Sequence, residues 1–116
     1  MSHLPSKARK PIRVACQALG GKWELEVLGE LQRGPLRFSE IRRHLPCIPP
    51  KSLGRALRKL EQEGFIRRSI NAGRPPQVIY AMLQEDVLLR QIIESLERWG
   101  ERRTKQLAAG HQGTDP

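Results

Sequence analysis

The chain of 116 residues contains 21 Lys or Arg and 12 Asp or Glu, which gives a formal net charge of +9 at pH 7. Its length fits one domain with a modest core, and no run approaches the roughly 18 apolar residues that a membrane span requires. The basic N-terminus lacks the apolar segment of a signal peptide, and two cysteines make no disulfide framework, so a reducing cytoplasm is the expected location.

The positive charge is concentrated in the first 83 residues. This part holds 16 Lys or Arg against 6 Asp or Glu, whereas residues 84–116 hold 5 against 6. Such an asymmetric positive field favours a polyanionic partner, and nucleic acid is preferred to a membrane. The plainer alternative is a basic surface with no specific partner.

The N-terminal third of the chain is expected to be helical. Residues 1–11 should form a flexible basic arm, because Pro5 and Pro11 interrupt any helix. Amphipathic helices are predicted over 12–19 and about 22–32, each closed by a glycine-containing turn. A very short edge strand is expected immediately afterwards.

Two helices joined by a proline-broken turn follow. Ser39 is the expected N-cap of the first, which should continue to Leu45 because Pro46 ends it. Pro50 suits the first position of the second helix, which should end near Glu63, before a left-handed glycine.

The remaining third predicts a β-hairpin and a long helix. Runs with strand character at 65–70 and 78–83 flank the loop NAGRPPQ. An amphipathic helix should run from about 85 to 107, and residues 108–116 should be a disordered tail. The order indicates a mainly α fold with a small β-hairpin wing, a winged helix-turn-helix over residues 12–107 with an added C-terminal helix.

The second helix of the pair has two chemically distinct faces. At about 100° per residue its leucines form one stripe, while basic residues gather on the opposite side. A solvated charged face is the ordinary explanation. The first three turns, however, contain no acidic residue that would neutralise the cations, and this favours DNA. The leucine side comprises Leu53, Ala56, Leu57 and Leu60, and the basic side comprises Lys51, Arg55 and Arg58, with Ser52 and Lys59 on one flank.

These residues divide into two expected roles. Lys51, Ser52 and Arg55 should enter the major groove, where Arg or Lys donates to guanine O6 and N7. Arg58 and Lys59 should meet phosphates, which adds affinity and salt dependence.

Two further positions have open alternatives. Arg74, at the hairpin tip, should lie along the minor groove, the alternative being a mobile loop charge. Gly54, in mid-helix, allows close approach either to the duplex or to the preceding helix.

Several motifs in order resemble the HxlR-type family of winged-helix transcriptional regulators, over roughly residues 10–103. The resemblance implies a homodimer, most often a repressor, that binds a pseudo-palindromic operator through its recognition helix and wing and dimerises through its N- and C-terminal helices. By position, Lys51, Ser52 and Arg55 match the family's recognition helix, and Arg74 matches its wing. The matching segments are LGGKW (19–23), LQRGPLRFSEIRRHLPCIPPKSLGRALRKLEQEGFIRR (31–68), RPPQVIY (74–80) and LERWGE (96–101).

Departures from the family pattern concern thiols and the start of the recognition helix. Redox-sensing members carry Cys-Pro near the N-terminus, where this chain has Lys10-Pro11. Ser-Pro-Lys is often found where this chain has Pro49-Pro50-Lys51, so a serine cap is lost. Cys47 lies in the turn beside basic residues and is the candidate redox thiol, although cysteines such as Cys16 and Cys47 are more often small buried hydrophobes.

Apolar residues on the C-terminal helix recur at i, i+3, i+4 and i+7, and burying them against a second copy would supply a two-fold interface. The expected interface residues are Leu89, Ile92, Ile93, Leu96 and Trp99.

No cofactor, metal site or enzymatic activity is predicted. His44-x-x-Cys47 is too sparse for zinc, and no nucleophile–base set is present. The resulting hypothesis is a dimeric regulator of double-stranded DNA whose effector the sequence does not reveal. The alternative is a winged-helix module for protein interaction or RNA binding.

Overall fold

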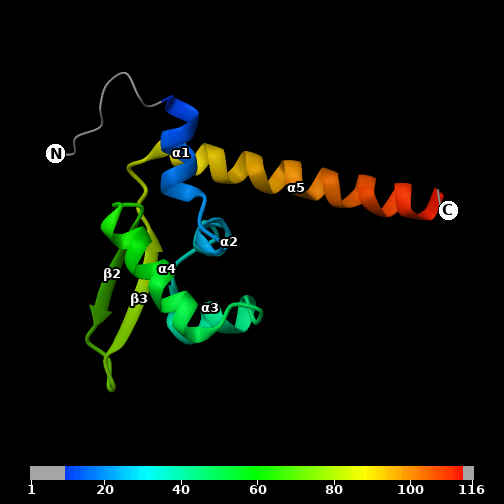
Figure 1. The fold of residues 1–116 in the computed structure, drawn as a ribbon. Helices are drawn as coiled ribbons and strands as arrows, with labels where there is room; N and C mark the ends of the chain where they lie inside the picture. The colour runs from blue at the N-terminus through cyan, green and yellow to red at the C-terminus, as the bar shows by residue number, and fades with distance from the viewer. Residues whose placement is uncertain (1–9, 114–116) are drawn as a thin grey trace. The chain divides into compact units, whose positions relative to one another are not determined.

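The computed structural model describes residues 10–113 and divides after Leu83 into two units (Figure 1). The second unit contains one long helix, α5 (Val87–Gly113). The first contains the helices α1 (Pro11–Leu19), α2 (Glu24–Leu31), α3 (Phe38–His44) and α4 (Pro50–Gln62), and the strands β1 (Leu36–Arg37), β2 (Ile66–Asn71) and β3 (Gln77–Met82). This order confirms the predicted winged helix-turn-helix fold.

The core of the first unit lies between α2, α4 and the base of the sheet. Apolar residues of α2 and α4 recur at helical spacing, so each helix turns one continuous stripe inward. Ile41 of α3 and Ile66 of β2 close the remaining sides. The fully or nearly fully buried residues of the two central helices are Val27, Leu28, Leu31, Leu53, Ala56, Leu57 and Leu60.

The three strands form an antiparallel sheet in the order β1-β3-β2. The predicted edge strand pairs with β3, with Leu36 opposite Tyr80. In the hairpin, Ile66 lies opposite Met82, and both are buried. Because side chains alternate between the faces of a strand, this pair fixes which hairpin residues share the helix-facing side.

The N-terminal prediction needs one correction. Residues 1–9 of the proposed arm lie outside the described residues, so the arm stays a prediction. Pro11 was expected to interrupt a helix, but it is the first residue of α1. A proline is favourable there because the N–H that it lacks would have no intrahelical partner.

The predicted N-cap of α3 is also wrong. The helix begins at Phe38, so Ser39 lies within the first turn and Arg37 is the N-cap residue. Glu40 caps in its place, since its carboxylate accepts hydrogen bonds from the Arg37 backbone N–H at 2.8 Å and from the guanidinium at 3.3 Å. The backbone hydrogen bond, followed by the guanidinium, lowers the pKa of Glu40 from its ordinary value.

Helix α4 has the predicted ends. Pro50 is the first residue of α4. Gly64, with φ +83°, takes the left-handed conformation that stops the helix. The adjacent N–H of Phe65 donates to the carbonyl of Leu60 at 3.0 Å, which turns the chain into β2.

The C-terminal helix is longer than predicted. It begins at Val87 and continues to Gly113, so the tail expected from residue 108 is helical as far as Gly113. At 1.5 Å per residue, 27 residues span about 40 Å. Asp86 accepts a hydrogen bond from the Leu89 N–H at 3.0 Å and so caps the start. Among residues 10–113, no helix is long and apolar enough to cross a membrane.

Candidate nucleic-acid interface

The outward face of α4 is positively charged. Lys51, Arg55 and Arg58 are exposed, whereas the whole leucine stripe is buried. Burial of that stripe fixes the rotation of the helix about its axis and therefore directs the three cations to solvent. The division into faces that the sequence predicts is confirmed.

Lys59 has a different environment from the three outward cations. Its ammonium lies 3.8 Å from a carboxylate oxygen of Glu24 and donates to the Gln17 carbonyl at 3.3 Å. Glu24 is a buried residue of α2, and the Lys59 side chain is partly exposed, so their ion pair links α4 to α2. The hydrogen bond to the Gln17 carbonyl links α4 to α1. Lys59 is therefore held between helices in the free protein.

Ser52 and Arg55 border a hollow of about 390 Å³ beside the start of α2. Lys22 contributes to the same hollow, and its ammonium lies 5.0 Å from the centre of the Trp23 ring. Sequence reasoning overlooked Lys22 as a neighbour of α4. The turn that carries it approaches α4 only through tertiary packing, for which the sequence contains no local signal.

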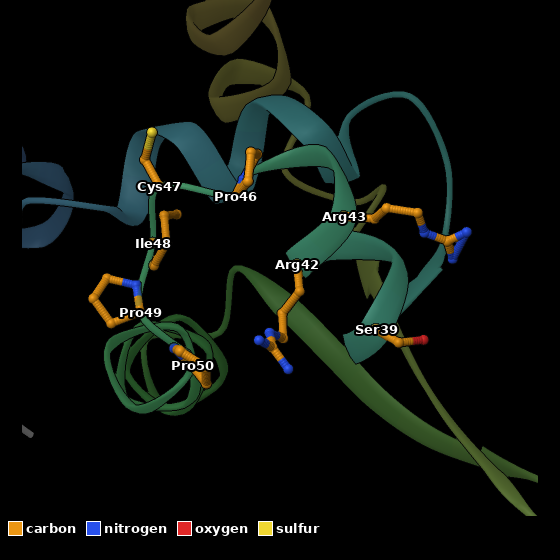
Figure 2. Close-up of a pocket in the computed structure, with 8 residues that line it drawn as sticks. All are labelled: Ser39, Arg42, Arg43, Pro46, Cys47, Ile48, Pro49 and Pro50. Atoms are coloured by element: carbon orange, nitrogen blue, oxygen red, sulfur yellow. The ribbon is translucent and has the colours of Figure 1, made fainter.

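The turn between α3 and α4 borders a second hollow, of about 670 Å³ (Figure 2). Arg42 points from α3 toward the first residues of α4, whereas Arg43 points away from them. Among the described residues, no side chain caps α4, which agrees with the missing serine cap. Beyond Pro50, the first backbone N–H groups of this helix have no intrahelical acceptor and can bind an anion.

The hairpin carries exposed cations along its length. Arg67 and Arg68 lie on β2, and Arg74 lies in the loop at the tip. The loop is ordered in part by Asn71, whose side-chain oxygen accepts a hydrogen bond from the Gly73 N–H at 3.1 Å.

Cys16 and Cys47 are both exposed and unpaired, so neither is the buried hydrophobe considered above. In Figure 2 the Cys47 sulfur points away from Pro50 and the start of α4. A redox role for Cys47 stays a prediction. Within residues 10–113, no group of three or more His, Cys, Asp or Glu could hold a metal ion.

Only part of the predicted C-terminal interface is exposed. Ile92, Leu96 and Trp99 are exposed and line a shallow hollow of about 450 Å³ on α5. Leu89 and Ile93 are already buried. Three of the five expected interface residues are therefore available to a second copy.

Comparison with known proteins agrees with this geometry. An HTH-type transcriptional regulator of Methanothermobacter thermautotrophicus strain Delta H is 40% identical over 89 residues, which cover 77% of this chain and 68% of the relative. The HTH-type transcriptional regulator YkvN of Bacillus subtilis strain 168 is 38% identical over 87 residues, covering 75% and 74%. The reduced form of the redox regulator HypR superposes with a TM-score of 0.76 at 30% identity, covering 86% of this chain and 99% of that one.

Residues 18–108 match the HxlR-like helix-turn-helix family. Both the exposed basic helix and the flanking hairpin lie within this span. The chain therefore belongs to the HxlR-like family of helix-turn-helix transcriptional regulators.

Proposed function

We propose that this protein is a homodimeric repressor that recognises a pseudo-palindromic operator through α4. The observation that carries the proposal is the outward face of α4, where three exposed cations face solvent and no acidic residue lies in the first three turns. A merely solvated helix gains from mixed charges, because (i, i+4) pairs of opposite sign stabilise it. A helix face that carries only positive charge is instead expected where a polyanion binds to it.

Base recognition is assigned to the first half of α4. Lys51 and Arg55 are exposed one turn apart and can both donate to guanine O6 and N7 in the major groove. Ser52 is half-buried on the flank, where its hydroxyl can reach a base edge or a phosphate.

Phosphate binding is assigned to groups around this helix. Arg58 lies one turn beyond Arg55, and the uncapped start of α4 adds backbone N–H groups near Arg42. Lys59 as a phosphate contact stays a prediction, and it requires the ammonium to leave Glu24 and the Gln17 carbonyl. Arg74 is placed in the adjacent minor groove, where cations are favoured.

Dimerisation is supported by apolar surface that both terminal helices expose. No residue of α1 is buried, and Ile12 is 71% exposed. On α5, Ile92, Leu96 and Trp99 form an exposed apolar stripe. Covering such faces with a second copy would give an isologous interface and two recognition helices about one turn of DNA apart.

The DNA assignment predicts different effects for two arginines of the same face. Arg55→Ala should weaken binding to the protein's own upstream DNA by roughly ten-fold, because one guanine contact is worth about 1–3 kcal/mol. It should weaken binding to random DNA much less. Arg58→Ala should weaken both about equally and reduce the slope of log K against log [salt] by about one.

Fluorescence anisotropy with both duplexes, at matched ionic strength, measures these constants. If wild type binds upstream and random DNA equally, the alternative of a protein- or RNA-binding module is favoured. Equal behaviour of the two variants would instead place Arg55 outside the groove.

Gly54 provides a test that separates binding from stability. A methyl group at this position would contact only the far end of the Arg58 side chain, at 3.6 Å, within the described part of the chain. The preceding helix therefore does not require a glycine here, and close approach of DNA stays the proposal to be tested.

Gly54→Ala should raise the free energy of unfolding by up to about 1 kcal/mol, because alanine favours the helix. If DNA approaches this position closely, the same variant should bind operator DNA more weakly. Urea denaturation and anisotropy measure the two effects. A variant that is more stable and binds normally would show that Gly54 has no role in DNA contact.

The dimer proposal predicts that Trp99→Ala lowers the molar mass measured by light scattering at low micromolar concentration. Lys105→Ala is the control, because Lys105 is exposed on the same helix and lies nine residues after Leu96, which places it on the opposite face. An unchanged mass for Trp99→Ala, or the same decrease in both variants, would contradict the assigned interface.

A further inference from the structure

The hairpin presents an apolar surface beyond the core. Ile70 on β2 lies opposite Val78 on β3, one residue pair before the last pair of the ladder, Asn71 with Gln77. Ile70 is 60% exposed, and Val78 is half-buried. We call these two residues the apolar ledge.

The ledge lies on the face of the hairpin that also packs on the helices. Ile66 and Met82 are buried on that face at the base of the sheet. Counting by two along each strand in the observed register brings Ile70 and Val78 to the same side. Figure 1 shows the far end of the hairpin extending beyond α4. Ile70 lies close to that end in the strand register, and its exposure shows that the core does not cover it.

The charges around the ledge indicate which partner covers it. Residues 65–83 contain three arginines and no acidic residue. A second copy of the hairpin would bring the same cations and repel it. A DNA groove offers phosphates to the arginines and apolar deoxyribose walls to the ledge, so it is complementary to both.

We propose that Ile70 contacts the floor and wall of the minor groove beside each half-site and thereby selects A·T over G·C pairs there. This inference rests on the proposed function, in which the hairpin enters the minor groove. In that groove a G·C pair differs from A·T chiefly by the guanine N2 amino group, a hydrogen-bond donor. An isoleucine contact removes water from this donor and supplies no acceptor, which carries a free-energy cost that A·T pairs avoid.

Inosine makes the test specific. An I·C pair presents the G·C pattern in the major groove and lacks the minor-groove amino group. Three duplexes would share the same half-sites and carry A·T, G·C or I·C pairs where the wing lies. Wild type should bind the G·C duplex roughly ten-fold more weakly than the A·T duplex, and I·C should restore most of the loss.

Ile70→Thr should bind all three duplexes within about two-fold of one another, because the hydroxyl can accept from the amino group while the β-branched shape suits the strand. Arg74→Ala is the control. It should weaken binding to all three duplexes yet keep the wild-type order, since its contribution is charge.

Each other outcome overturns the proposal. Failure of I·C to restore binding would place the preference outside the minor-groove amino group. Retention of the order in Ile70→Thr, with its loss in Arg74→Ala, would assign the preference to charge in a narrow groove. If wild type fails to distinguish its operator from random DNA, the proposed function itself fails, and that result is separate from the flank comparison.

Discussion

The burial of one leucine stripe determines what this protein can present to a partner. Leu53, Leu57 and Leu60 are almost completely removed from solvent between α2 and the sheet. Each residue of a helix turns the next by about 100°, so a shift of one position would send Arg55 or Arg58 toward the core. The apolar contact therefore sets both the stability of α4 and the direction of its charge.

The rest of the first unit maintains this orientation. Lys59 holds the flank of α4 to Glu24 and to the Gln17 carbonyl, and the Gly64 turn passes the chain directly into β2. Lys51, Arg55 and Arg58 are exposed on the opposite side, where the first three turns of α4 contain no acidic residue to pair with them. These cations repel one another in the free protein, and their charge is complementary to that of phosphates in a complex.

Periodic features were predictable from the sequence, and features set by tertiary contact were not. The leucine spacing correctly predicted α4 and its buried face, and Pro50 correctly predicted where the helix starts. The cap of α3 was missed because Ser39 has good local propensity, whereas Glu40 caps from within the turn. The place of Lys22 in the candidate interface was missed for a similar reason, because Lys22 reaches the edge of α4 only through packing of the α1–α2 turn.

Methylation interference on the upstream DNA tests most directly whether α4 reads bases in the major groove. Methyl groups on guanine N7 block donation from Lys51 or Arg55 and leave phosphates unchanged. We expect interfering guanines in two clusters centred about ten base pairs apart, as a two-fold dimer requires. Binding that tolerates methylation at every guanine, and is lost only when phosphates are ethylated, would contradict the account.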